Sequence, residues 1–366
     1  MALGPAIARP DCTARGGSPP FGMRRLALVA ALLAACGSDA GAERFPLHRF
    51  TWLEVPGNVC GDGSPTGVSV SRGEGDGLLV FLDGGGACWD ALTCFGAGDL
   101  PPLVSSDGPF AAAEADARLR RVPGSVLDRT LPGNPFAAYT FVFVPYCTGD
   151  VHAGDASQSY LGAPSRFQHR GRANVRRALA ALAAALPPPA DVVLAGASAG
   201  GYGALVNYPA VRETWPDARG NLVDDSGPPL VGTDLSPAIV ASWVLAWRLD
   251  EAIVPICGDA CLADLSRVLP ALSGRWPEDR LALLSTTRDE VIRAYTLLGA
   301  DGFERALDRL VTGVVEPLPN AAAFRVAGSG HTMLGDPGRF TAGDTSLLAW
   351  LRAQVERAPG WRSTGP

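Results

Sequence analysis

Leu194-Ala195-Gly196-Ala197-Ser198-Ala199-Gly200-Gly201 has the Gly-x-Ser-x-Gly pattern of a nucleophile elbow. The apolar run 191–194 before it predicts a buried strand, and residues 202–208 after it predict a helix that ends at Pro209. A strand, a tight turn and a helix lift a serine hydroxyl above the edge of a sheet, where glycine leaves room for the turn. In a chain with 44 glycines the alternative is a simple small-residue turn, but the flanking elements favour Ser198 as a catalytic nucleophile.

Strand and helix patterns alternate on both sides of this elbow, which is typical of a mostly parallel sheet with helices on both faces. We therefore predict an α/β fold of the α/β-hydrolase type, with a helical cap inserted at about 228–279. The predicted strands are 45–55, 68–70, 77–82, 139–145, 220–224, 280–287 and 322–327, and the predicted helices include 174–186, 290–295 and 345–357.

The amino-terminal region predicts export. Residues 1–22 look like a mis-called start, and residues 23–35 form a signal peptide with two arginines and a short apolar run. That run ends at Cys36 in a pattern that resembles a lipoprotein cleavage site, so we expect lipidation of Cys36, membrane anchoring and a tether over 36–44. An ordinary signal peptide is the alternative. Residues 45–360 are predicted to form one catalytic domain.

Composition excludes several function classes. The net charge of −6 and the pI near 5.3 argue against a nucleic-acid partner. The chain has no lysine, which excludes lysine-based Schiff-base chemistry.

Six cysteines remain after Cys12 and Cys36, and an even number in an exported chain favours disulfides. Sequence allows 15 pairings, of which we favour Cys88–Cys94, Cys257–Cys261 and Cys60–Cys147. Zinc is the weaker alternative because no Cys-x-x-Cys pair occurs. We expect no metal and no cofactor.

A glycine run follows the predicted strand 77–82, over Asp83-Gly84-Gly85-Gly86-Ala87-Cys88-Trp89. Backbone N–H groups at such a strand end suit an oxyanion hole, to which the residue after the nucleophile, Ala199, also contributes. A phosphate-binding loop is disfavoured because no Gly-Lys-Ser/Thr follows.

Four histidines are candidates for the general base. His331 follows the last strand, as expected for the order nucleophile, acid, histidine. His152 is the alternative, at a strand end where it could line the pocket. His48 and His169 are interpreted as surface or cap residues.

The acid is predicted after the penultimate strand, at Asp289. Asp224 and Asp225 are alternatives, although local hydrogen bonds within their Asp-Ser-Gly turn explain them equally well.

Together these segments resemble the pectin acetylesterase family. The residues that carry the resemblance are Leu82–Trp89, Tyr146-Cys147-Thr148-Gly149-Asp150, Gly196–Gly201, Leu222–Gly227 and Gly330-His331-Thr332. The resemblance, which runs from about residue 45 to 350, implies a serine carboxylester hydrolase with Ser198, Asp289 and His331 as triad. It also implies Gly85, Gly86 and Ala199 as oxyanion donors. Gly86 stands where family members often carry tryptophan, which leaves the pocket shape and the substrate class open.

The predicted function is hydrolysis of an acyl ester, acetyl being one candidate acyl group, on an extracytoplasmic small molecule or polysaccharide. The alternative is a lipid-tethered binding protein with a vestigial triad.

Overall fold

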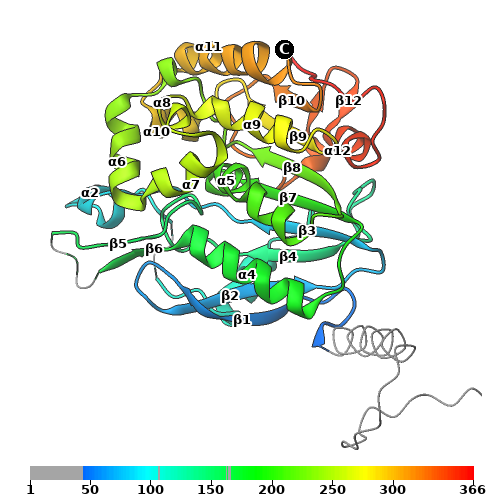
Figure 1. The fold of residues 1–366 in the computed structure, drawn as a ribbon, viewed down its shortest axis with the longest axis horizontal. Helices are drawn as coiled ribbons and strands as arrows, with labels where there is room; N and C mark the ends of the chain where they lie inside the picture. Colours follow the sequence, from blue (N-terminus) through cyan, green and yellow to red (C-terminus); the bar gives the residue numbers. More distant parts are fainter. Residues whose placement is uncertain (1–43, 106–107, 162, 164–165) are drawn as a thin grey trace, which may run out of the picture.

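Eight strands form the central sheet in the order β1-β2-β4-β3-β7-β8-β9-β10 in the computed structural model, which describes residues 44–105, 108–161, 163 and 166–366 (Figure 1). β1 pairs with β2, and β2 with β4, in antiparallel fashion, whereas the neighbours from β4 to β10 pair in parallel. The mostly parallel α/β-hydrolase sheet predicted from the sequence is confirmed. The strands are β1 Thr51–Val59, β2 Pro65–Ser71, β3 Gly77–Leu82, β4 Thr140–Val144, β7 Asp191–Ala197, β8 Arg219–Asp225, β9 Arg280–Thr286 and β10 Ala321–Val326.

Helices cover both faces of the sheet. On one face the core joins side chains of α4, α5, α9 and α11 to the sheet, and on the other it joins α12 and residues 110–136. The helices are α2 Ala91–Phe95, α3 Ala112–Leu119, α4 Gly171–Ala185, α5 Ala199–Thr214, α6 Pro237–Trp247, α7 Leu249–Cys257, α8 Ala260–Ala263, α9 Val268–Arg275, α10 Glu290–Thr296, α11 Ala300–Leu310 and α12 Leu347–Val355. Short helical turns are η2 Gly232–Asp234, η3 Leu265–Arg267, η4 Val311–Val315 and η5 Pro337–Arg339; two small hairpins are β5 Ala156–Gln158 with β6 Phe167–His169 and β11 Thr341–Ala342 with β12 Thr345–Ser346.

Two element boundaries differ from the prediction. Helix α5 continues through Pro209 to Thr214, because buried Tyr208 and Val211 on either side of the proline pack into the core and offset one lost backbone hydrogen bond. The first strand begins at Thr51 rather than at residue 45. Pro46 and the positive φ of His48, 60°, interrupt the extended chain between them.

The three predicted disulfides, Cys60–Cys147, Cys88–Cys94 and Cys257–Cys261, are confirmed. Such bonds persist in oxidising compartments, so they indicate that the folded chain works outside the reducing cytoplasm. The predicted signal peptide and Cys36 lie outside the described residues. None of the helices in the described part of the chain combines the length and apolar character needed to cross a bilayer.

Helices α6 to α9 occupy the predicted cap region at 228–279. Their roles divide. Helix α9 packs on α5 and on β9 within the layer that covers the sheet, whereas Trp243 and Trp247 of α6 line a pocket beside Ser198. The boundaries of the cap and of the catalytic domain stay predictions.

Candidate active site

Ser198 stands at the turn between β7 and α5, with φ 58° and ψ −118°. This backbone conformation is rare for residues other than glycine and stores strain. A Cβ atom on Gly196 would lie 2.0 Å from the carbonyl oxygen of Gly200, and one on Gly200 would lie 2.0 Å from that of Leu82. The turn closes only because these positions lack side chains, and it presents the serine to two adjoining pockets.

His331 lies in the loop after β10, and its Nδ1 is 2.8 Å from Oδ2 of Asp289 and 3.0 Å from Oδ1. Asp289 is fully buried at the start of α10, where its Oδ1 accepts hydrogen bonds of 3.0 Å from the N–H groups of Val291 and Ile292. These two bonds fix the carboxylate, so the acid holds Nδ1 protonated and leaves Nε2 free to accept a proton.

Ser198 and His331 line the same pocket. Their side chains form no direct hydrogen bond among the described residues. Catalytic hydrogen bonds of this kind often form only when substrate binds.

The main hydrogen-bond partners of Asp225 are distant in the sequence, whereas the sequence analysis expected local ones. Its Oδ2 accepts hydrogen bonds of 2.7 Å from the N–H groups of Met333 and Leu334, more than 100 residues away in the chain. It therefore anchors the backbone that follows His331, while the imidazole ring contacts Asp289. Complete burial raises the pKa of Asp225 to about 6. Local hydrogen bonds account fully for Asp224, whose Oδ1 accepts from Gly227 N–H at 2.8 Å, and in part for Asp225, whose Oδ1 accepts from the Ser226 hydroxyl at 3.4 Å.

The loop after β3 lies directly against Ser198. A Cβ atom on Gly84 would lie 3.0 Å from the Cβ of Ser198. Gly86 has φ 80°, and no hydrogen bond of the described residues uses the N–H groups of Gly85 or Gly86. The N–H of Ala199, at the first position of α5, has no acceptor within its own helix. These three donors are available to a negative charge next to Ser198.

Asp83, the first residue of that loop, is fixed through each of its polar groups. Its N–H donates to Val144 O at 3.0 Å, and Arg118 holds its carboxylate with two bonds of 2.8 and 2.6 Å. Nε2 of His152 lies 2.9 Å from its carbonyl oxygen. A carbonyl only accepts, so His152 carries its proton on Nε2 and donates it.

His152 is thus a buried positioning residue, 2% exposed, and does not line the pockets beside Ser198. Burial lowers its pKa to about 4, which keeps the ring neutral. The sequence offered it as an alternative base and gave no signal for this contact with Asp83.

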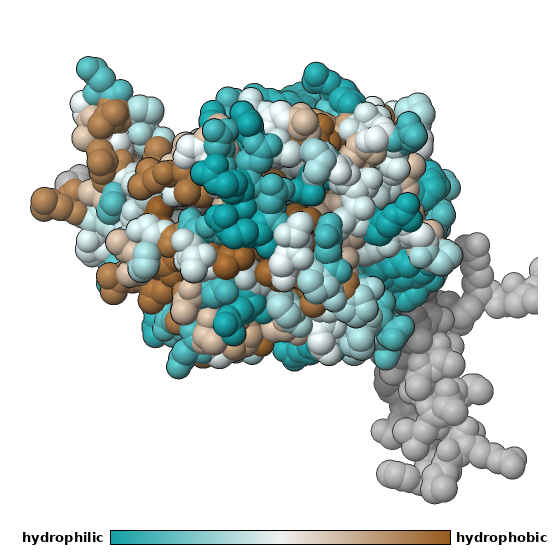
Figure 2. Space-filling view, turned by 90° about the horizontal axis from the view of Figure 1, so that it is seen from above, coloured by the Kyte–Doolittle hydropathy of each residue, from teal (hydrophilic) through white to brown (hydrophobic). Residues whose placement is uncertain are grey.

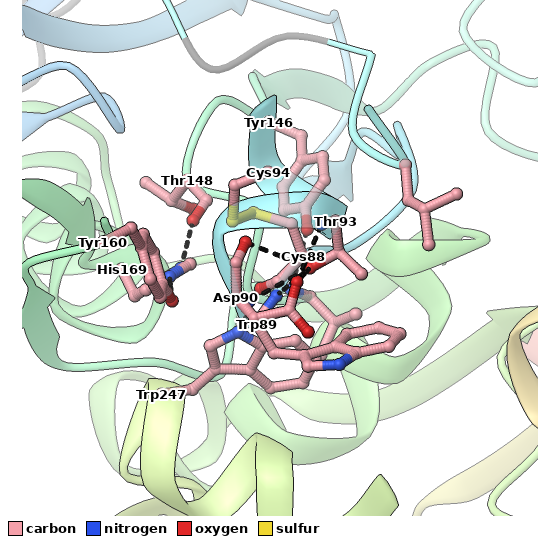
Figure 3. The surroundings of a disulfide bond; sticks show 12 residues. Cys88, Trp89, Asp90, Thr93, Cys94, Tyr146, Thr148, Tyr160, His169 and Trp247 are labelled. Carbon is pink, nitrogen blue, oxygen red and sulfur yellow. Dashed lines mark hydrogen bonds between the residues drawn. A yellow bond between two sulfur atoms is a disulfide. The ribbon is translucent and has the colours of Figure 1, made fainter. Parts of the chain in front are cut away.

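His169 is also buried, which corrects the surface or cap assignment. Its Nδ1 lies 2.8 Å from Thr148 O, and its Nε2 lies 2.8 Å from the Tyr160 hydroxyl (Figure 3). One ring nitrogen of His169 lies within 4.8 Å of the sulfurs of Cys88 and Cys94. These cysteines form a disulfide, so they offer no thiolate to a metal. His48 is half-exposed, as predicted for a surface residue.

An apolar pocket opens at Ser198 and runs under α6 and α7. Its cavity volume is about 80 Å³. Trp243 and Trp247 are stacked with ring centroids 5.7 Å apart, and Trp247 Nε1 donates to Cys88 O at 2.7 Å. The other apolar lining residues include Val206, Leu249, Ile253, Leu265, Val268 and Ile292. The sequence placed these tryptophans in the cap but did not assign them to a pocket, although their spacing of four on one helix puts them on one face.

A second, more polar pocket lies on the other side of Ser198. Asp83, Ser105, Arg118 and His331 are among its lining residues. The serine therefore stands between an apolar space and a polar one.

Comparison with known proteins gives a consistent result. The family model described as pectinacetylesterase matches residues 43–238. The human protein named palmitoleoyl-protein carboxylesterase NOTUM is 29% identical over 207 residues, which are 56% of this chain and 39% of that protein. The Xenopus laevis protein named palmitoleoyl-protein carboxylesterase notum1′ is 26% identical over 254 residues, which are 68% of this chain and 47% of that protein.

The chain therefore matches less than half the length of these curated relatives. Among solved structures, that of the Wnt deacylase Notum from Drosophila superposes with a TM-score of 0.61 at 18% identity, covering 87% of this chain and 99% of that one. This likeness shows the fold.

Proposed function

This chain belongs to the pectinacetylesterase family, and we propose that it is a serine carboxylester hydrolase in which Ser198, His331 and Asp289 form the catalytic triad. The observation that carries the proposal is the hydrogen bond of 2.8 Å between His331 Nδ1 and the buried Asp289 carboxylate, in a loop that shares a pocket with the strained Ser198. The names of the relatives, which are carboxylesterases, support the same reaction class.

The reaction has two halves. His331 Nε2 takes the proton of the Ser198 hydroxyl while Oγ attacks the ester carbonyl carbon. The N–H groups of Gly85, Gly86 and Ala199 receive the developing oxyanion. His331 then gives its proton to the departing alcohol, which leaves an acyl group on Ser198. Water attacks this acyl-enzyme with His331 as base and releases the acid and the free serine.

Each of the two pockets holds a different part of the substrate. An acyl chain fits the apolar pocket under α6 and α7, and the alcohol lies on the polar side with Ser105 and Arg118. An acetyl group offers one methyl to a pocket whose apolar lining extends from Trp243 to Val268 and Ile292, so we propose that the preferred acyl group is a longer aliphatic chain. Each buried methylene contributes about 0.8 kcal/mol.

Hydrolysis of nitrophenyl esters from acetyl to dodecanoyl tests both statements. We expect kcat/KM to rise with chain length. Val268→Phe, which narrows the apolar pocket, should lower the rate on long chains while the same variant keeps its rate on acetate. Flat or falling rates with length would contradict the acyl assignment but leave the triad intact.

A fluorophosphonate probe tests the enzyme itself. We expect Ser198 to be labelled in the wild-type protein and unlabelled in Ser198→Ala. Folded wild-type protein that takes up no label would support the alternative, a binding protein with a vestigial triad.

A further inference from the structure

Helix α6 has the composition of a buried helix but the position of a surface helix. Its sequence, Pro237 to Trp247, contains no charged residue, yet only Ala246 and Trp247 are buried. A helix that is apolar on all sides is normally enclosed in a protein core or in lipid. Leu245 on this helix is 77% exposed. Its outer side therefore lacks a covering element in the described chain.

A second apolar segment lies beside α6. Residues 91–103, which contain α2, carry a single charge, Asp99. Leu92 and Leu100 of this segment are 50% and 62% exposed. Trp89, just before α2, packs edge-on against Trp243 and Trp247 with centroids 6.1 and 6.4 Å away, so the two segments adjoin. Figure 2 shows apolar surface gathered at the end of the molecule that carries α2 and α6 in Figure 1.

This apolar face, defined by α6 and residues 91–103, continues into the apolar pocket. Trp243 and Trp247 line that pocket from α6, while Leu245 of the same helix faces outward. Helix α6 alone would thus separate an aliphatic chain held at the apolar face from the pocket at Ser198. A partner that presents an aliphatic chain to this pocket is the occupant that the geometry fits.

We propose that this apolar face docks on a zwitterionic lipid surface, from which acyl esters enter the pocket. We choose a zwitterionic lipid surface because the apolar face carries almost no charge. A face that binds an anionic membrane or a charged protein displays a set of complementary side chains. This one has only Asp99 within it, with Asp90 and Arg248 of opposite sign at its ends. Exposed leucines on and beside an uncharged helix suit the boundary between headgroups and acyl chains. The inference goes beyond the proposed reaction and does not require turnover.

Binding to phosphatidylcholine vesicles, measured by co-sedimentation, tests the inference. The triple variant Leu92→Ser/Leu100→Ser/Leu245→Ser should bind about tenfold or more weakly than wild type, because it removes three exposed apolar anchors. The matched control is Leu47→Ser, since Leu47 is 45% exposed but pairs with Arg72 at the opposite edge of the sheet. The control should bind like wild type, and all variants should keep wild-type rates on soluble nitrophenyl acetate.

Four outcomes would overturn the proposal. Wild-type protein that stays unbound at millimolar lipid would do so, as would equal loss in the Leu47→Ser control. A concentration-dependent dimer that the triple variant dissociates would assign the face to a second copy of the chain. Phosphatidylserine added to the vesicles should not strengthen binding, and strengthening would point to a cationic surface elsewhere. Activity in all variants, measured alongside, separates a failure here from a failure of the proposed esterase function.

Discussion

Two loops at the same edge of the sheet each carry a histidine, and the two histidines have different hydrogen-bond partners. His331, after β10, is partly exposed to the pocket and bonds a carboxylate. His152, after β4, is buried and bonds the carbonyl oxygen of Asp83. A carboxylate stabilises a charged imidazolium, whereas a carbonyl in a buried site fixes a neutral ring as a donor. From the partner of each ring we therefore expect His331 to transfer protons and His152 to position a loop.

The largest expected effect on kcat comes from removing His331 or Ser198. Ser198→Ala and His331→Ala should each lower kcat by about 10⁴-fold to 10⁶-fold, because nucleophile and base act as one unit. The double variant should be no slower than either single variant. Steady-state rates on a soluble nitrophenyl ester measure this. A double variant far slower than both would mean that the two residues act independently.

Asp289→Asn should reduce kcat by about 10³-fold to 10⁴-fold, because asparagine favours the wrong imidazole tautomer and cannot stabilise the cation. The amide can still accept from Val291 and Ile292, so the melting temperature should change little. Rate and melting temperature measured together distinguish a chemical from a structural role. An active Asp289→Asn protein would return the acid to Asp224 or Asp225.

His152 should show a smaller effect of a different kind. His152→Asn cannot reach Asp83 O and should lower kcat by about 10-fold to 100-fold, because the loop carrying Gly85 and Gly86 loses its support. His152→Gln places an amide N–H near the position of Nε2 and should restore most of the rate. KM should change little in both. Equal losses in the two variants, or a loss confined to KM, would refute the positioning role.

Much of this arrangement could be predicted from the sequence, and the reason is local. Strands such as β3 and β7 are buried on both sides and read as continuous apolar runs, and the order Ser198, Asp289, His331 follows from strand-end position. The contact between His152 and Asp83 joins residues 69 apart, so no local pattern reports it. The same holds for Asp225, whose partners lie 108 and 109 residues away. The path of α5 through Pro209 also depends on tertiary packing, which overrides the local preference.

Asp225→Asn should affect stability more than chemistry. One carboxylate oxygen serves both Met333 and Leu334, and an amide that rotates to avoid a clash loses part of this anchoring. We expect a loss of about 1–3 kcal/mol in the free energy of unfolding with a rate that changes by less than about tenfold. Denaturant unfolding and initial rates are the measurements. Lost activity at unchanged stability would contradict this division between Asp225 and Asp289.

The last prediction concerns the pH dependence of stability and involves the smallest effect on turnover. The pKa of His152 is about 4 in the folded protein against an ordinary value of 6.5, so only the unfolded chain binds this proton between those values. Wild-type stability is therefore lost as pH falls through this range, and His152→Gln escapes that loss. The stability of the variant relative to wild type should rise by about 2–3 kcal/mol between pH 7 and pH 4.5. Exposed His48→Gln serves as the control. A pH-independent difference for His152→Gln would show that the ring is not held neutral.

The glycines around Ser198 also shape which variants of this protein can exist. A Cβ atom at Gly196, Gly200, Gly201 or Gly203 would come within 2.0 to 2.8 Å of a neighbouring atom, so hardly any coding change there is tolerated. The outward positions of helix α6 are the reverse, because Pro237, Ala238, Ala241 and Leu245 are exposed. Lineages and laboratory libraries should thus diversify along α6 and remain invariant at the elbow. New substrate preferences can be acquired through the helix while the reaction is inherited unchanged.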